Sequence, residues 1–365
     1  AIVSVAGRYA GDVALECLGR DLNVMLYSDN VSLEKEVEIK KVAREKGLLV
    51  MGPDCGTIIV RGVAMGMANA CPTGPVSLVA AAGTGLQEVH VQLAKRGVGT
   101  LHGIGTGGRD VKAEVGGLMV EMGVQTLLAD DEVKVLVVVG KPPAPEVEQK
   151  ILAQVRAGGK PAVLGFIGGE ARGDQPPVYI CRELEETAAV AAALAKGEDV
   201  AAARRSLAEA DDALKALAGK IGPRKGWLRG LYSGGTLCYE AQLIAQDLLG
   251  PIHSNTPLKK ELRLEDSLAS VEHSIVDFGE DEFTQGRLHP MIDVSLRVSA
   301  LNLMNRLNRE TGISFLYITH DLATARYNGR AGRIAIMYLG QIIEQGPAMR
   351  VIAQPMHPYL RTLIS

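Results

Sequence analysis

The sequence predicts an α/β protein built on parallel sheets. Short apolar strands alternate with amphipathic helices along most of its 365 residues, a pattern typical of parallel sheets. Glycine contributes 42 residues while aromatic residues make up only 4 %, which favours many tight strand-to-helix turns. The length corresponds to about two to three domains.

Residues 1–60 predict strand, helix, strand, helix and strand. The expected elements are Ile2–Val5, Ala10–Leu18, Asn23–Tyr27, Leu33–Lys46 and Leu48–Met51. Ser32 precedes the second helix and is expected to cap it. The chain opens at Ala1 directly inside the first strand, so we expect it to begin within a domain.

The same alternation resumes near residue 74 and continues to residue 167. The expected strands are Val76–Ala81, one around Leu101, Val133–Val139 and Ala162–Ile167. Three helices are expected between and after them: one that ends at Lys95, one over Val115–Leu128 and one over 146–157. Residues 183–220 are rich in Ala, Glu and Lys, and they predict two helices broken at Gly197. We interpret them as a bridging or covering segment rather than a site.

Residues 228–250 repeat the pattern of residues 76–99. The two stretches read LRGLYSGGTLCYEAQLIAQDLLG and VSLVAAAGTGLQEVHVQLAKRGVG, each a strand, a Gly-Thr turn and an amphipathic helix. We interpret this as a tandem duplication of one α/β module. Glu88 and Glu240 are expected in the first turns of these helices, where they would stabilise the helix dipole rather than act as bases.

Charge, cysteine content and hydropathy exclude several classes of protein. A net charge of −3 provides no extended basic surface for nucleic acid. The 5 cysteines are scattered without a CxxC pair, which predicts a reduced, cytoplasmic protein. The apolar runs are shorter than the roughly 18–20 residues needed for a membrane span. No metal-ligand motif is present in the sequence.

The two Gly-Thr turns are the first candidate site. Such a turn exposes backbone N–H groups at the positive end of a helix, which suits a phosphate or another anion. The alternative is that glycine only closes a tight turn. The candidate residues are Gly83, Thr84, Gly85, Gly234, Gly235 and Thr236.

A second glycine-rich loop, ahead of Arg109, follows a predicted strand. It contains Gly105, Thr106, Gly107 and Gly108. It lies at the carboxyl end of that strand, where α/β proteins form ligand sites, although it is also compatible with a flexible connection. Cys55 has no neighbouring histidine in the sequence, so we do not expect it to be a nucleophile.

Residues 1–295 resemble FdrA-type acyl-CoA synthetase-like proteins, which are relatives of the succinyl-CoA synthetase α subunit. The motifs that carry the resemblance occur in order as AIVSVAGRYAG, MLYSDNVSLEKEVEIKKVAREKGLLVMGPDCGT, AAGTGLQEV, GIGTGGRDV, GKPPAPEV, LRGLYSGGTLCYEAQ and GEDEFTQGRLHPMID. The resemblance implies a truncated Rossmann-like CoA-binding half at 1–70 and flavodoxin-like ligase modules at 71–182 and 225–293, the second incomplete. The helical segment 183–224 joins these modules.

The resemblance also implies chemistry. The expected function is acid-thiol (CoA) ligase-like, or a related acyl or carbamoyl transfer, with CoA or phosphate/ATP as cofactor and a partner subunit. Three departures are present. The glycine-rich turn that holds the CoA phosphates in this family would precede Ala1, GGEARGDQPPVYICRELEE contains no histidine for a phosphohistidine relay, and Lys141 stands where the family has an acidic residue.

Residues 293–365 resemble the C-terminal end of oligopeptide-type ABC transporter ATPases, so 294–365 are expected to form a partial ATPase lobe. The segments are DVSLRVSALNLMNRL, FLYITHDLATARY, RIAIMYLGQIIEQGP and QPMHPYLRTLIS, and the resemblance implies that His320 is the switch histidine. The sequence contains no GxxxxGK[ST] loop, so we expect no ATPase activity from this chain and a non-functional His320.

Both resemblances share Asp293 and the residues 295–297, which suggests a fusion of two partial genes. Two alternatives stay open. The chain is part of a peptide-transport ATP-binding subunit, or it is a non-catalytic regulatory module.

Overall fold

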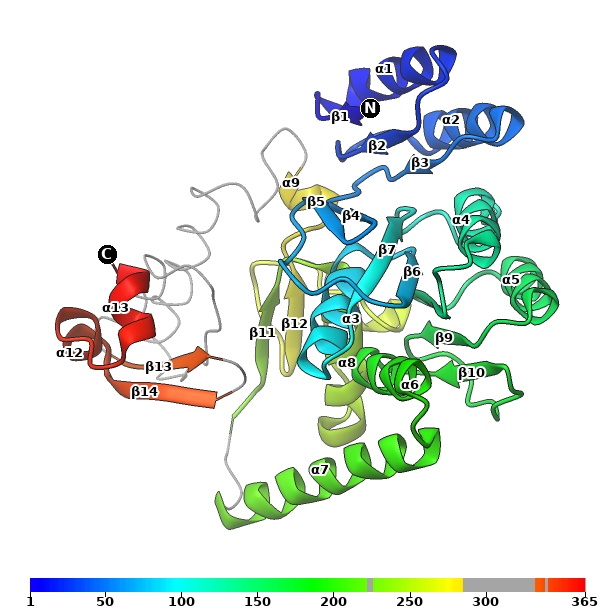
Figure 1. Cartoon of the computed structure of the whole chain (residues 1–365). Coiled ribbons are helices and arrows are strands. Elements are labelled where there is room, and N and C mark those ends of the chain that lie inside the picture. Colours follow the sequence, from blue (N-terminus) through cyan, green and yellow to red (C-terminus); the bar gives the residue numbers. More distant parts are fainter. Residues whose placement is uncertain (222–225, 285–331, 339–340, 365) are drawn as a thin grey trace. The chain divides into compact units, whose positions relative to one another are not determined.

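The computed structural model describes residues 1–221, 226–284, 332–338 and 341–364. These form two compact units, one comprising 1–225 with 234–277 and the other 226–233 with 278–365. Each unit is described by itself below, and Figure 1 gives the element labels.

The first unit opens with a small parallel sheet in the order β1 (Ile2–Val3), β2 (Val24–Leu26), β3 (Val50–Met51). Helices α1 (Gly7–Gly19) and α2 (Leu33–Lys46) connect these strands. The hydroxyl of Ser32 accepts a hydrogen bond from the Lys35 amide at 3.3 Å, which confirms the predicted cap.

A 7-stranded sheet follows in the order β10-β9-β8-β6-β7-β4-β5. Its parallel strands are β6 (Val76–Ala80), β7 (Thr100–Gly105), β8 (Val135–Gly140), β9 (Ala162–Phe166) and β10 (Val178–Cys181). An antiparallel hairpin of β4 (Thr57–Val60) and β5 (Val63–Gly66) extends one edge through β7. Sequence analysis missed both the hairpin and β10. The hairpin pairs with the large sheet and not with the first three strands. The predicted domain limits, 1–70 and 71–182, stay a prediction.

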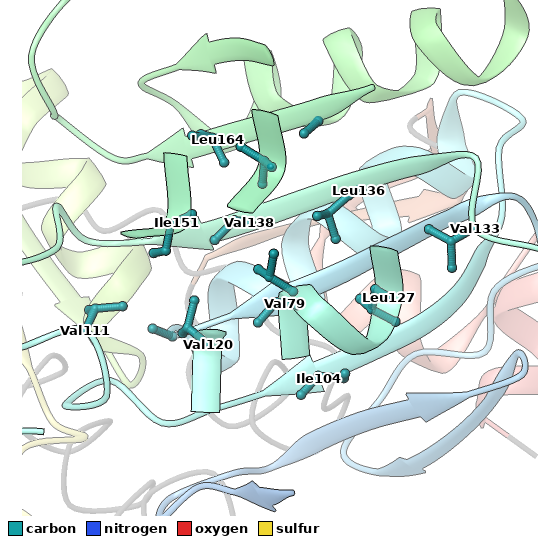
Figure 2. Close-up of a cluster of buried hydrophobic side chains, with 14 of the residues drawn as sticks. Val79, Ile104, Val111, Val120, Leu127, Val133, Leu136, Val138, Ile151 and Leu164 are labelled. Carbon is teal, nitrogen blue, oxygen red and sulfur yellow. The ribbon is translucent and has the colours of Figure 1, made fainter. Parts of the chain in front are cut away.

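Helices cover both faces of the large sheet. Successive residues of β8 point to opposite faces, so Leu136 and Val138 join one apolar cluster while Val137 joins the other. The first cluster lies under α4 (Leu118–Ala129) and α5 (Pro145–Gly158), and Figure 2 shows its side chains meeting between strands and helices. The second cluster lies under α3 (Gly83–Lys95) and α6 (Leu184–Lys196).

The Ala-rich segment divides into a core helix and an outer helix. Gly197 ends α6 in the left-handed region at φ 70°, and α7 (Val200–Ile221) follows, which confirms the predicted break. Most of α6 is buried against the sheet, so this half of the segment covers the core and does not bridge domains.

The second Gly-Thr turn precedes α8 (Gly235–Leu249) in the first unit, after β11 (Arg229–Tyr232) of the second unit. The 3₁₀ helix η1 (Lys260–Leu262) and β12 (Ser274–Asp277) come next in the first unit. The residues before α3 and α8 have nearly the same backbone angles, φ −163° and ψ 102° at Ala82 against φ −166° and ψ 107° at Gly234. The two helices therefore begin with the same local backbone conformation, and the duplication stays a prediction.

The second unit also contains α9 (Asp281–Thr284), a hairpin of β13 (Arg333–Tyr338) and β14 (Gln341–Pro347), α12 (Ala348–Ala353) and α13 (Pro358–Ile364). We predicted the strand at Ile334–Tyr338 and expected it to pair with 314–318 or with the ligase-like modules. Among the described residues its partner is β14, and the pairing with 314–318 stays a prediction. The expected helix 298–310, the strand 314–318 and His320 lie outside the described residues.

Candidate anion site at two helix N-termini

The turn between β6 and α3 leaves backbone donors open. The first intrahelical bond of α3 runs from the Leu86 amide to the Ala82 carbonyl at 2.9 Å, so the N–H groups of Gly83, Thr84 and Gly85 precede it. No side chain caps this helix. Gly83 is exposed, and no atom lies within 4 Å of the position that a Cβ would occupy there. A small anion therefore has room to approach these amides.

The first turn of α8 lies directly against that of α3. A Cβ added to Gly234 would stand 2.5 Å from the Cγ2 of Thr84, and one added to Gly85 would stand 3.1 Å from the Cγ2 of Thr236. Figure 1 shows α3 and α8 as neighbours. Each helix N-terminus carries roughly half a positive charge, so their meeting creates an electropositive point. The two predicted Gly-Thr turns thus lie next to each other in the structure.

Neither Glu88 nor Glu240 lies in a first turn, which corrects the sequence expectation. Glu88 accepts a hydrogen bond from Gln92 at 2.7 Å. Glu240 accepts one from the Leu184 amide at 2.7 Å, at the start of α6. Burial and the neighbouring carboxylate of Glu183 raise the pKa of Glu240 to about 6. Neither carboxylate therefore lies at the N-terminus of its own helix.

The loop 105–108 lies beside the first turn, but most of it is structural. The Thr106 amide donates to the Ala80 carbonyl at 2.8 Å, and the Thr106 side chain is fully buried. A Cβ on Gly105 would stand 2.8 Å from the sulfur of Cys55, and Gly107 adopts φ 85° against the Pro53 carbonyl. Gly108 alone is exposed, since a Cβ there would meet only the Ala81 carbonyl at 3.8 Å. Of the four predicted residues in this loop, only Gly108 is open to a ligand.

The end of this loop is fixed by a buried ionic cluster. The Lys40 ammonium donates to Glu36 at 2.7 Å, to Asp110 at 2.9 Å and to the Thr106 carbonyl at 2.8 Å, with all three charged side chains fully buried. Arg109 pairs with Glu36 at 2.7 Å. Asp110 also accepts the Val120 amide at 2.7 Å at the start of α4. The two positive and two negative charges of the cluster balance, so Arg109 pairs within the protein and does not contribute a charge to a ligand site.

A different cation, Lys141, lies against α8. Lys141 follows the last residue of β8, and its ammonium lies 5.0 Å from the ring centroid of Tyr239 in α8. Sequence analysis noted that this lysine stands where the family that the chain resembles has an acidic residue, and did not count it among the candidate site residues. The signal that could have found it is its position after a strand next to β6.

The cysteines offer no nucleophile at this place. Burial raises the pKa of the Cys55 thiol to about 12 and that of the Cys238 thiol to about 11. Both are therefore neutral near pH 7, which agrees with the expectation for Cys55. Among the residues that the structure describes, no group of three His, Cys, Asp or Glu side chains could hold a metal ion.

A cavity of about 610 Å³ lies elsewhere, between β10, α6 and α7. Tyr179, Leu194 and Arg204 are among its lining residues, and none of the predicted site residues lines it. Within the described ranges, no helix is long and apolar enough to cross a membrane.

Comparison with known proteins identifies a CoA-related segment. The family described as the CoA binding domain matches residues 73–168, whereas the sequence resemblance placed the CoA-binding half at 1–70. The uncharacterized protein YahF of Escherichia coli K12 is 41 % identical over 305 residues, covering 82 % of this chain. This chain spans only 58 % of the length of YahF.

Two further similarities are more limited. A stretch of 74 residues, 20 % of this chain, is 47 % identical to 12 % of the glutathione import ATP-binding protein GsiA of Pectobacterium atrosepticum. The structure of a dinucleotide-forming acetyl-coenzyme A synthetase from Ca. Korarchaeum cryptofilum, in complex with phosphate and ADP, superposes with a TM-score of 0.43 at 12 % identity. That superposition covers 67 % of this chain and 54 % of the synthetase.

The chain is thus an α/β protein with a Rossmann-like CoA-binding domain, and a short segment of it is similar to ABC transporter ATPases.

Proposed function

We propose that this chain is part of a CoA-ligase-like protein that transfers an acyl or carbamoyl group with CoA or phosphate. The observation that carries the proposal is the contact between the first turns of α3 and α8, in each of which three amides precede the first intrahelical bond. The match of residues 73–168 to the CoA binding domain supports it, because that segment includes α3 and the loop 105–108. A partner subunit would complete the active site.

In this proposal the amides act by electrostatic stabilisation. Backbone N–H groups fixed at helix N-termini favour negative charge on a phosphoryl or acyl oxygen at little reorganisation cost. The thiols of Cys55 and Cys238 are neutral and the segment 168–186 contains no histidine, so the proposal assigns no covalent step to these residues. The chain's role would be to hold the oxyanion in position during transfer.

Gly83→Ala tests this function with little risk to the fold. The added methyl enters space in which no protein atom lies within 4 Å, at the first residue of α3, so it would narrow the approach of a ligand to the backbone without touching the protein. Gly19→Ala, also in open space at the end of α1, is the matched control. Titration calorimetry with inorganic phosphate and with CoA should show affinity at least about tenfold weaker for Gly83→Ala only. Equal affinity in all three proteins would contradict the proposal.

A second candidate function is a transport ATP-binding subunit, favoured by the 74-residue similarity to GsiA. It would require a second chain that supplies a GxxxxGK[ST] loop. Co-purification of such a chain, with ATP hydrolysis by the complex, would favour this function. CoA binding without turnover would instead indicate a regulatory module.

A further inference from the structure

We infer that the outer edge of β5 is an interaction surface, and that it pairs antiparallel with the β5 strand of a second copy of this chain. This surface is separate from the proposed anion site, since it uses backbone groups of β5 and none of the glycine turns. In the described part of the chain β5 is the last strand at its end of the 7-stranded sheet, so only one of its two edges has a neighbouring strand.

The hydrogen-bond register shows which backbone groups of β5 face outward. The Met67 amide donates to the Gly56 carbonyl at 2.7 Å, in register with the residue pairs of β4 and β5. Because hydrogen-bonded residues alternate along an antiparallel ladder, Met65 also bonds to β4. The N–H and C=O groups of Ala64 and of Gly66 therefore point away from β4, toward the outer edge.

These outward groups are open to another strand. Ala64 and Gly66 are exposed, and among the residues that the structure describes neither has a hydrogen-bond partner on the outer side. Proteins commonly protect such an edge with charged side chains or proline. The stretch 62–71 contains neither. The edge therefore offers backbone donors and acceptors to any strand that can lie beside it.

The other edge of the same sheet is protected. In β10 the Ile180 amide donates to Asp174 at 3.0 Å, and the Ile180 carbonyl accepts from Arg204 at 2.9 Å. Side chains there occupy the backbone groups that a further strand would need. Within the described ranges, the sheet is thus blocked at β10 and open at β5.

The geometry favours a second copy of β5 as the partner, because this edge is complementary to itself. With a two-fold axis beside Met65, Ala64 of each copy lies opposite Gly66 of the other, and each pair exchanges two hydrogen bonds. The same register places Val63, which is 64 % exposed in the single chain, against Met67 of the other copy. Since residues 62–68 carry no charge, this pairing opposes no like charges.

Sedimentation velocity of the full chain over a range of about 5 to about 500 µM tests the inference. The strand is short compared with a standard interface of about 1,200–2,000 Å², so the wild type should shift from monomer to dimer as the concentration rises. Ala64→Pro removes the outward N–H and no bond to β4, so it should raise the Kd of the dimer at least about tenfold. Ala64→Ser keeps that N–H and is the matched control, which should dimerise like the wild type.

Two further variants separate this pairing from misfolding and from other partners. Val63→Lys places a charge at an exposed position beside the axis, so it should weaken the dimer without disturbing the core. Met65→Cys identifies the second copy, because the pairing brings the two Cα atoms of this position to about 4.5 Å, a distance that a disulfide spans. Mild oxidation should cross-link this variant into a covalent dimer and leave the wild type, with its 5 cysteines, uncross-linked.

A wild type that stays monomeric at the highest concentration would overturn the inference, even if an extended peptide of another protein binds to β5. So would a dimer that both Ala64→Pro and Val63→Lys leave unchanged, or one in which Met65→Cys forms no covalent dimer.

Discussion

Lys40 is the residue whose loss we expect to destabilise this protein most. Its ammonium is fully buried between Glu36 and Asp110 and also bonds the Thr106 carbonyl, so it joins α2 to the loop beside the candidate site. Removing one partner from a buried ion pair leaves an uncompensated charge and costs about 3–5 kcal/mol. Urea unfolding of Lys40→Met should show a loss of this size. The exposed control Lys41→Met should stay within about 0.5 kcal/mol of the wild type, and equal stability of both variants would contradict this account.

Glu240 makes the stability depend on pH in a specific window. Its pKa is about 6 in the folded protein, above the ordinary value of 4.5, because burial and nearby carboxylates disfavour its charge. The folded state therefore holds the proton more tightly than the unfolded state. The stabilisation is complete below about pH 4.5 and is lost as the pH rises to about 6, a change of about 1–2 kcal/mol.

Glu240→Gln checks this assignment, because glutamine does not titrate. Thermal unfolding measured from pH 4 to pH 7.5 should show a smaller fall in stability for the variant than for the wild type. Glu183, whose pKa burial also raises, would account for a remaining fall in the same direction. Identical pH profiles would exclude Glu240 as the source.

At the scale of elements, β10 is an edge strand whose backbone groups are occupied. Asp174 accepts the Ile180 amide at 3.0 Å, and Arg204 of α7 donates to the Ile180 carbonyl at 2.9 Å. Exposed edges recruit further strands, so Arg204→Met should increase self-association at high concentration. Sedimentation velocity measures this. Arg205→Met on the same helix, where the wild-type arginine pairs with Asp199, should stay unchanged, and equal behaviour of the two variants would contradict the role of Arg204.

At the scale of the whole molecule, local sequence signals predicted the elements they control. Ser32 and Gly47 bound α2, and the structure confirms its predicted limits, Leu33 and Lys46. The hairpin β4–β5 was missed because both central residues of its turn have positive φ, 49° at Arg61 and 75° at Gly62. Such turns are usually indicated by Asn-Gly or Asp-Gly in the sequence, and here arginine stands at the first position.

Of the candidate site, the sequence predicted only the part that local motifs encode. The Gly-Thr turns are local motifs and were found, whereas their contact depends on how α3 and α8 pack. Thr106 and Gly107 share the glycine-rich pattern of the loop but serve the fold, which only their neighbours reveal. The pairing of β6 with β8 brings the strand before α3 beside the strand before Lys141, a non-local relation that sequence spacing does not encode.

The absence of a phosphate loop from the sequence predicts that this chain alone hydrolyses no ATP, despite its 74-residue similarity to GsiA. One neutral hydrogen bond from His320 contributes about 0.5–1.5 kcal/mol, whereas even millimolar binding requires about 4 kcal/mol. A phosphate-release assay on wild type and His320→Ala should give background rates for both. A wild-type rate that disappears in His320→Ala would favour the transport function.

The central claim is that an oxyanion binds where the first turns of α3 and α8 meet. The most direct measurement is anomalous diffraction from crystals of this chain soaked in tungstate, a heavy analogue of phosphate, with a second crystal in which excess phosphate competes. We expect one phosphate-sensitive peak within hydrogen-bond reach of the amides of Gly83 and Gly235. Ordered density for both helices with no peak between them, or with peaks only elsewhere, would contradict this account.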